Sequence, residues 1–448
     1  MELSVSNHSL SPLSEPETYL TQLLATVTAA VPTALALPAL RQTATALVQE
    51  QTFPSPRQEA WRFSDLSGLL ALAFQVAEPP SPSALEAIAA IPARPETANS
   101  RLVFVNGVYV EALSSRSALP EAVVVGSLAT LYAQPDLQPE IERHLAQAQG
   151  HNEVFTALNT AGFQDAALIW VPRSVELSVP IQLVHYSLPV PEQTPVIAQP
   201  RTLVMAAANS SLTLIEEYHS LGEGHCFTNA VSEIWLAANA QVHHVRLQDE
   251  AKTTFHIAKT AVTQARDSFY SCTAIDLGAR LARHHLETYQ TGEQTNTRLY
   301  GLSAIAGDQL ADTQSLISLS QPYGSADQLH KCIVGDRAHA VFSGKIYVPR
   351  EAQHTHAAQL NRNLLLSNKS RVDTKPQLEI IADNVKCAHG ATVSQLEADE
   401  IFYLQSRGIN AEQAQRLLIY GFAMEIVEKI PVDSLRESLT QRVNQWMS

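Results

Sequence analysis

The sequence contains few cysteines, and their spacing restricts the sites that they can form. There are four in 448 residues, and no two of them stand in a C-x-x-C pair: Cys226, Cys272, Cys332 and Cys387. Disulfide frameworks and structural zinc sites use cysteines at short, recurring spacings, so this pattern disfavours both. We therefore expect free thiols in a reducing compartment, and we predict a cytoplasmic protein.

Long hydrophobic runs and a secretory leader are also missing from the sequence. No apolar run reaches the ~18 residues that a membrane-spanning helix needs. The N-terminal stretch is polar and acidic, and it lacks the basic and apolar regions of a signal peptide. These features predict a protein without a membrane partner.

Common motifs of nucleotide binding and nucleophilic catalysis are absent as well. Ser343-Gly344-Lys345 is followed by Ile346 rather than Ser or Thr, and it lacks the upstream glycine of a Walker A loop. No G-x-G-x-x-G opens a strand–helix unit, and no G-x-S-x-G elbow is present. The formal net charge of −14 disfavours a nucleic-acid partner. These absences exclude the commonest nucleotide-hydrolysing and acyl-transfer sites.

The apolar periodicity divides the chain into three predicted domains. Residues 1–95 have helical spacing, residues 96–392 are mainly short alternating segments with a helical insertion near 137–161, and residues 393–448 return to helical spacing. The alternating segments recur roughly every 25–30 residues, with small-residue turns between them. This repeat favours a mainly β solenoid, most simply a parallel β-helix, flanked by helical domains. A β-sandwich is the second interpretation.

Several local signals predict turns and helix ends. Asn106-Gly107 between apolar residues is typical of a β-hairpin turn. The apolar stretch 69–76 predicts a helix, and Gly408 is expected just beyond the end of a later one. Asn410 and Ser434 are followed three residues later by Gln and Glu, so both are predicted helix N-caps.

The strongest candidate for metal chemistry is the pair Cys387 and His389. In a strand, residues two apart share one face, and thiol and imidazole groups suit iron–sulfur chemistry or zinc. Two ligands do not complete a typical four-ligand site, so we interpret the pair as half a site whose remainder lies on a partner. The alternative to a ligand role for Cys387 is that it serves only as a small buried hydrophobic residue. The adjacent pairs His243-His244 and His284-His285 alternate faces in any strand and are not expected to chelate as units.

A set of spaced blocks then identifies a family. From Val341 to Phe422 the chain closely resembles the C-terminal region of the SufB/SufD iron–sulfur cluster assembly proteins. The matching blocks are Phe342-Ser-Gly344-Lys345-Ile, Gln359-Leu-Asn361-Arg-Asn363-Leu-Leu-Leu-Ser367, Lys375-Pro376-x-Leu378-Glu379-Ile380, Val385-Lys-Cys387-x-His389-Gly390-Ala-Thr392 and Phe402-Tyr403-Leu-x-Ser406-Arg407-Gly408. Glu59-x-Trp61-Arg62 in the helical N-terminus resembles the SufD branch more than the SufB branch.

The resemblance implies a right-handed parallel β-helix with helical ends, acting as a noncatalytic scaffold subunit. It implies that His389 is a candidate ligand of iron or of a transient cluster at a heteromer interface, and that Cys387 is a weaker candidate. No permanently bound cofactor is expected. His356 stands where many relatives have an acidic residue, and whether it adds a ligand stays open.

The resemblance also implies partners. The last β-helix coils would pair with a SufB-like paralogue, and residues 393–448 would dock a SufC-like ABC ATPase, which supplies the ATPase activity. One alternative is a self-sufficient homodimeric scaffold or cluster carrier of the SufB type, with a homodimer also possible for the isolated chain. A second alternative is an extracellular β-helix protein that acts on or binds carbohydrate, which the missing signal peptide disfavours.

Overall fold

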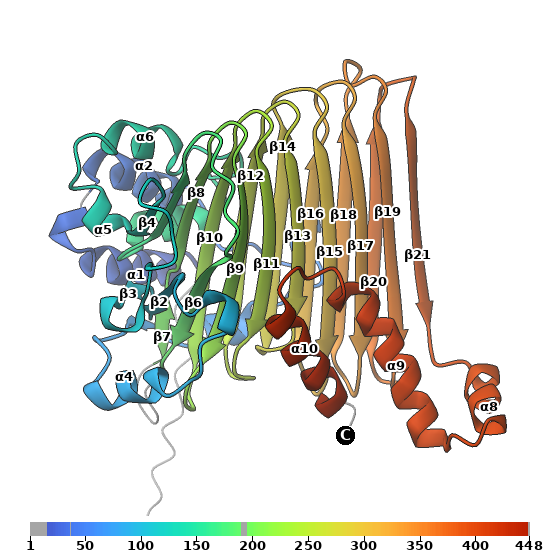
Figure 1. The fold of residues 1–448 in the computed structure, drawn as a ribbon. Helices are drawn as coiled ribbons and strands as arrows, with labels where there is room; N and C mark the ends of the chain where they lie inside the picture. The colour runs from blue at the N-terminus through green and yellow to red at the C-terminus, as the bar shows by residue number, and fades with distance from the viewer. Residues whose placement is uncertain (1–15, 36, 190–194, 447–448) are drawn as a thin grey trace, which may run out of the picture.

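The computed structural model describes residues 16–35, 37–189 and 195–446, and it is dominated by two long β-sheets (Figure 1). The strands are β1 (Gln75–Val76), β2 (Arg101–Val105), β3 (Val108–Tyr109), β4 (Val124–Ser127), β5 (Ala167–Val171), β6 (Ile181–Ser187), β7 (Val196–Ala198), β8 (Arg201–Ala206), β9 (Ser211–Ser220), β10 (Cys226–Leu236), β11 (Gln241–Asp249), β12 (Phe255–Gln264), β13 (Phe269–Asp276), β14 (Leu281–Gln290), β15 (Asn296–Ile305), β16 (Leu310–Ser318), β17 (Ser325–Val334), β18 (His339–Val348), β19 (His356–Leu365), β20 (Arg371–Ile380) and β21 (Lys386–Ser394).

Helices flank the sheets at both ends of the chain. The α-helices are α1 (Pro16–Ala29), α2 (Pro38–Gln49), α3 (Ser67–Leu70), α4 (Pro82–Ala89), α5 (Leu128–Leu131), α6 (Gln138–His144), α7 (Val154–Gly162), α8 (Ala398–Ser406), α9 (Ala411–Val427) and α10 (Asp433–Trp446). Short 3₁₀ turns are η1 (Thr33–Leu35), η2 (Glu59–Trp61), η3 (Pro95–Thr97) and η4 (Glu111–Leu113). Among the described residues, no helix is long and apolar enough to cross a membrane.

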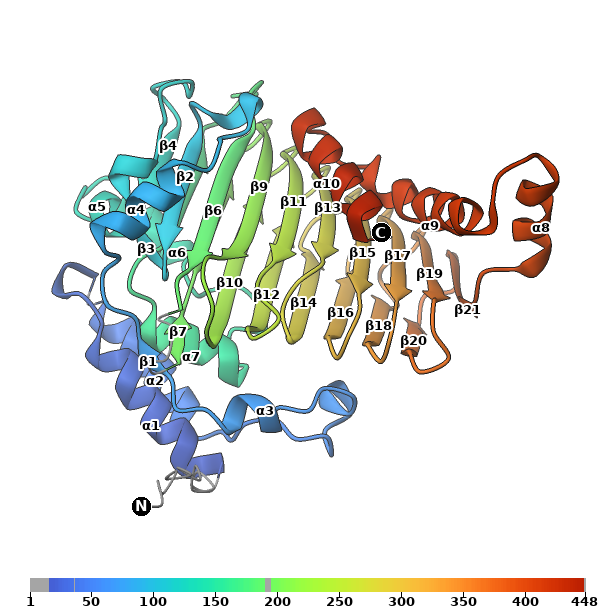
Figure 2. The same ribbon diagram turned by 90° about the horizontal axis from the view of Figure 1, so that it is seen from below.

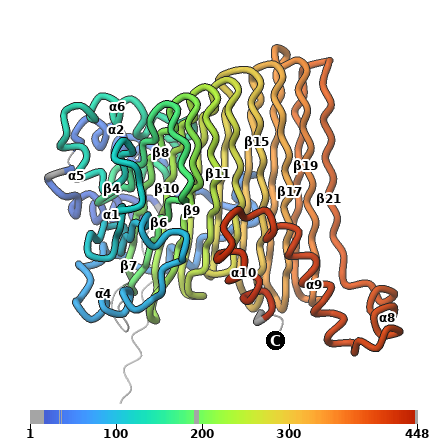
Figure 3. The backbone as a smooth tube through the Cα atoms, in the orientation of Figure 1, coloured from blue at the N-terminus to red at the C-terminus, as the bar shows by residue number. Residues whose placement is uncertain are grey.

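From β9 to β21 the chain alternates strictly between the two sheets, as a solenoid does. From β10 to β19 each strand pairs in parallel with the second strand before it and the second after it. The two sheets end in β20, which pairs with β18, and in β21, which follows β15, β17 and β19 (Figure 3). At one row of corners the stacked turns hold a residue with positive φ: Asn209, Asn239, Asp267, Gln294, Tyr323 and His354. Asn and Asp tolerate this conformation better than most side chains, which suits the first three corners. The predicted parallel β-solenoid is confirmed, and the sandwich interpretation is wrong.

Two sets of helices cover the outer faces of the solenoid. The N-terminal helices α1, α2 and α7 pack on one sheet through a cluster that includes Phe155, Phe227 and Phe255. Helices α9 and α10 pack on the other sheet (Figure 2). Ile333 of β17 and Ile426 of α9 belong to the hydrophobic cluster between them. Helix α8 projects beyond β21, at the far end of the solenoid from the N-terminal helices.

Most of the local predictions are confirmed. Residues Asn106 and Gly107 both have positive φ and join the antiparallel strands β2 and β3. Gly408 has φ +88°, and its N–H bonds to the carbonyl of Gln405 in a Schellman-type helix end. The side chain of Asn410 caps α9 by accepting a hydrogen bond from the N–H of Gln413. The three domain boundaries stay predictions.

Two local predictions are wrong. The stretch 69–76 is not one helix, because α3 ends at Leu70 and the chain then extends into β1, which pairs with β7. Ser434 does not cap α10 with its side chain, because the helix already begins at Asp433. The carboxylate of Glu96 accepts hydrogen bonds from the N–H and the hydroxyl of Ser434 instead. A distant anion therefore occupies this helix N-terminus, a position that favours negative charge.

Candidate functional site

The two sheets end in an open edge at the C-terminal side of the solenoid. Strand β20 pairs only with β18, and β21 pairs only with β19, so each has one edge without a partner among the residues that the structure describes. Most of β21 is exposed, including 48% of Val393. In β20, Pro376 lies opposite Gly344, and a proline is tolerated in an edge strand because half of the backbone groups there have no ladder partner. We call β20 and β21 together the open end.

Cys387 and His389 lie on the inward face of β21. Cys387 is in register with the buried Ala357 of β19, and it packs against the interior hydrophobic cluster. His389 is in register with the buried Gln359, two residues further along the same face. The prediction that the pair shares one face is therefore confirmed, and this face looks into the solenoid at its open end.

The two side chains differ in exposure and chemistry. Burial raises the pKa of the Cys387 thiol, so the thiol stays protonated at neutral pH and is a weaker metal ligand than a thiolate. His389 is exposed, and within the described part of the chain it makes no hydrogen bond or ion pair. An unengaged imidazole keeps a nitrogen lone pair available to a metal.

His356 does not join this pair. It occupies an exposed position on β19 opposite Lys386, and it has the opposite parity to Ala357 and Gln359, so it faces outward. The adjacent pairs His243-His244 and His284-His285 also place their two side chains on opposite faces of a strand, as predicted. His244 and His284 are buried, whereas the side chain of His285 reaches the outer surface and is 24% exposed.

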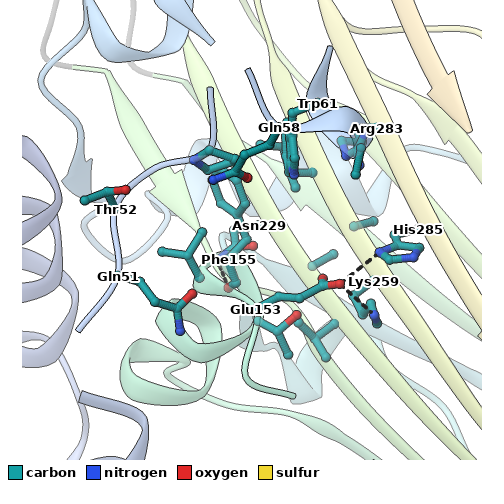
Figure 4. Close-up of a pocket in the computed structure, with 18 residues that line it drawn as sticks. Gln51, Thr52, Gln58, Trp61, Glu153, Phe155, Asn229, Lys259, Arg283 and His285 are labelled. Atoms are coloured by element: carbon teal, nitrogen blue, oxygen red, sulfur yellow. Dashed lines mark hydrogen bonds and ion pairs between the residues drawn. The ribbon is translucent and has the colours of Figure 1, made fainter. Parts of the chain in front are cut away.

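The structure brings together a charged cluster that sequence reasoning missed. Glu153, His285 and Glu287 present ligand atoms within 4.8 Å of one another. Glu153 and His285 also line a cavity of about 460 Å³, together with Trp61 (Figure 4). The ammonium of Lys259 lies 3.2 Å from Glu153 and 2.7 Å from Glu287. The buried Lys259 ammonium thus offsets one of the two carboxylate charges, and the cluster links the N-terminus of α7 to the sheet.

The C-terminal helices present an exposed apolar surface. Phe402 is 71% exposed and Tyr403 is 58% exposed on α8, and Leu417 of α9 is 48% exposed. Aromatic side chains at this exposure mark interaction surfaces more often than isolated aliphatic ones do. We call Phe402, Tyr403 and Leu417 the C-terminal patch.

Comparisons with known proteins agree over most of the chain. The family model "SufBD protein N-terminal region" matches residues 18–183, and "SUF system FeS cluster assembly, SufBD core domain" matches residues 190–422. A SufBD family iron–sulfur cluster assembly protein of Synechocystis is 46% identical over 414 residues, which is 90% of each chain. SufD of Escherichia coli is 34% identical over 88% of this chain and 89% of its own. The chloroplastic protein ABCI7 of Arabidopsis thaliana is 33% identical over 91% and 86%. The chain therefore belongs to the SufBD family of iron–sulfur cluster assembly proteins, and within that family it is SufD-like.

Proposed function

We propose that this chain is the SufD-type subunit of a cytoplasmic SufBCD scaffold and that its open end forms half of the cluster-assembly site. A SufB-like solenoid pairs with β20 and β21, a SufC-like ATPase docks on the C-terminal helices, and this chain catalyses no reaction itself. Iron and the nascent cluster are cargo that the interface holds transiently. The observation that carries the proposal is His389, which is exposed and makes no hydrogen bond or ion pair within the described residues, on the inward face of a terminal strand whose outer edge is unpaired there.

An unpaired strand edge supports the pairing step. Its free N–H and C=O groups form a template for another strand, and adding one satisfies them without rebuilding the fold. The solenoid core also remains partly uncovered there, because Leu378 and Ile380 of β20 are only half-buried against the interior cluster. A second solenoid placed end to end would cover both the backbone groups and this apolar surface.

Ligand chemistry supports the role of His389. Neutral imidazole is a ligand for iron, and the inward face of β21 would lie beside the inward face of the next strand if a partner solenoid paired there. Cys387 can contribute only after it loses its proton, so we assign it the secondary role. The ligands that this chain lacks would come from the partner, as the half-site hypothesis requires.

The C-terminal patch supports the ATPase contact. Helix α8 extends past β21, so a protein bound to it would lie close to the proposed subunit interface (Figure 2). Family membership leaves the carbohydrate-binding alternative without support. A self-sufficient homodimer remains an outcome of the test below, because two copies could meet through the same open end.

The test is anaerobic reconstitution of the chain co-purified with its SufB-like and SufC-like partners. Visible iron–sulfur absorption is compared among wild type, His389→Ala and His356→Ala, with complex assembly checked by size-exclusion chromatography. His356→Ala is the matched control, because it removes an exposed histidine from the outward face of the neighbouring strand. We expect all three complexes to assemble and only His389→Ala to lose the absorption.

Equal absorption in all three complexes would contradict a role for His389 in the site. Absorption gained by the isolated wild-type chain, with a homodimer in solution, would support the self-sufficient scaffold instead.

A further inference from the structure

The layer beneath His389 is a row of amide side chains inside the solenoid. Gln359 is in register with His389 on one side and with Gln328 on the other. The Nε2 of Gln359 donates to the Oε1 of Gln328 at 2.8 Å, and the Nε2 of Gln328 donates to the hydroxyl of Ser315 at the same distance. All of these side chains are buried, so each hydrogen bond is shielded from water.

The row has a defined direction, and it ends in an unused acceptor. Each amide nitrogen donates to a residue further from the open end, and the Oε1 of Gln328 accepts from the side of the open end. The Oε1 of Gln328 is taken by Gln359, but the Oε1 of Gln359 has no hydrogen-bond partner, although Gln359 is only 2% exposed. A buried acceptor without a partner is costly, so its place in the fold calls for an explanation.

A glycine on the facing sheet leaves the space for this amide. A Cβ atom on Gly344 would lie 2.4 Å from the Nε2 of Gln359 and 3.0 Å from its Cδ. Any larger residue at position 344 would therefore displace the Gln359 side chain. The fold thus leaves room for the Gln359 side chain, and Gln359 lies on the strand next to His389 and in register with it.

We propose that Gln359 is a positioning residue for His389: its Oε1 accepts the imidazole N–H when the open end is loaded with metal. In-register side chains on neighbouring strands have Cβ atoms about 5 Å apart, within reach of a rotation of the imidazole. A neutral imidazole has one N–H and one lone pair, so an acceptor for the N–H decides which nitrogen faces the metal. This inference rests on the proposed function of His389, and it names the group that orients it.

The experiment is an iron titration of the reconstituted three-subunit complex, followed by iron–sulfur absorption. Gln359→Leu removes the acceptor, and Asn363→Leu is the matched control. Asn363 is equally buried on the same face of β19, but it is in register with Val393 instead of His389. Loss of a group that orients a metal ligand typically weakens metal affinity by about 10–100-fold. We expect a shift of that size for Gln359→Leu and none for Asn363→Leu, with subunit assembly intact in both.

Two further variants separate positioning from packing. If Gln359 acts through His389, then Gln359→Leu causes no further loss of iron affinity in the His389→Ala background. If Gln359 has a structural role instead, Gln359→Leu lowers the affinity in that background as well. Gln359→Glu should restore most of the affinity, because a buried, protonated carboxyl offers both an O–H for Gln328 and a carbonyl for His389.

The results distinguish failure of the positioning role of Gln359 from failure of the proposed function of His389. If His389→Ala weakens cluster formation but Gln359→Leu does not, the positioning role is wrong and the proposed function stands. An equal shift from Gln359→Leu in both backgrounds would also overturn the positioning role. If His389→Ala itself has no effect, the proposed function fails and the inference fails with it.

Discussion

The ammonium of Lys331 on β17 donates a hydrogen bond to the backbone carbonyl of Phe422 on α9, with 2.9 Å between Nζ and O. The same ammonium forms an ion pair with Glu425 and lies 4.2 Å from the centroid of the Phe422 ring. Lys331 is only 1% exposed, so this contact is a buried polar connection between the solenoid and α9, the helix that carries Leu417 of the C-terminal patch. If an ATPase docks on the C-terminal helices as proposed, this contact connects its docking site to β17.

Replacing Lys331 by Met should destabilise the chain and loosen α9. A buried hydrogen bond from a charged donor contributes about 1.5–3 kcal/mol, so we expect a loss of that size in the free energy of unfolding. Urea denaturation measures it. Lys345→Met is the control, because its pair with Glu379 is 43% and 50% exposed and such pairs contribute about 0–1 kcal/mol. Equal losses in the two variants would contradict the buried connection.

Gly344→Ala and Gly421→Ala should change stability in opposite directions. At Gly344 the added methyl would collide with Gln359 and with the ring of Phe342, at 2.4 and 2.8 Å, which we expect to cost about 1–3 kcal/mol. At Gly421, inside α9, the methyl meets nothing within 4 Å, and alanine should stabilise the helix by about 0.5–1 kcal/mol. Thermal unfolding of the two variants tests both signs. A Gly344→Ala protein as stable as wild type would show that Gln359 and Phe342 can move to make room for the methyl group.

The double substitution Phe402→Ser, Tyr403→Ser should abolish binding of the SufC-like ATPase without unfolding the chain. Both side chains are more than half exposed, so their removal leaves the core unchanged. We expect the SufC-like ATPase to be lost from the co-purified complex while the SufB-like subunit is retained. Tyr323→Ser is the control, because Tyr323 is 51% exposed at a solenoid corner instead of on the C-terminal helices. Retention of the ATPase by the double variant would place its docking site elsewhere.

The charged cluster at α7 should make stability depend on pH. His285 faces Glu153 at the N-terminus of α7, Glu287 on its own strand and Lys259 on β12, and Tyr289 donates to Glu287. Burial lowers the pKa of His285, but the two carboxylates outweigh it and raise that pKa above its usual 6.5. Burial also raises the pKa of Glu287, yet His285 and Lys259 hold it at about 2.

The pH window of this cluster follows from these directions. Because the folded pKa of His285 is raised, its contribution to stability is complete below pH 6.5 and is lost as the pH rises through the folded value. Glu287 contributes above its ordinary pKa of 4.5, and this contribution is lost as the pH falls toward 2. The difference in unfolding free energy between wild type and His285→Gln should therefore be largest between pH 4.5 and pH 6.5, where both contributions are present. Urea denaturation across the pH range measures it, and a constant difference would contradict the assignment.

Patterns within a few residues, or repeated along the chain, were enough to predict the main features of the fold. The recurring alternating segments favoured the parallel solenoid over a β-sandwich, and Asn106-Gly107 and Asn410 predicted their turn and cap, because each depends on local backbone conformation. The two-residue spacing of Cys387 and His389 fixed their common face for the same reason.

Features that depend on distant segments were not predictable in this way. Glu153 meets His285 only because α7 packs on the sheet, and Glu96 displaces the expected cap at Ser434 from more than 300 positions away. The stretch 69–76 is apolar enough for a helix, but pairing of β1 with β7 decides its conformation. The free carbonyl of Gln359 is likewise visible only once its neighbours are in register.

The proposed function requires that His389 binds iron of the nascent cluster at the open end. Pulsed electron paramagnetic resonance tests this on the reduced, reconstituted complex in which only this chain carries ¹⁵N-labelled histidine. We expect a hyperfine coupling from a metal-bound ¹⁵N that is present in wild type and His356→Ala and absent in His389→Ala. A cluster signal of normal intensity without any ¹⁵N coupling in wild type would contradict it.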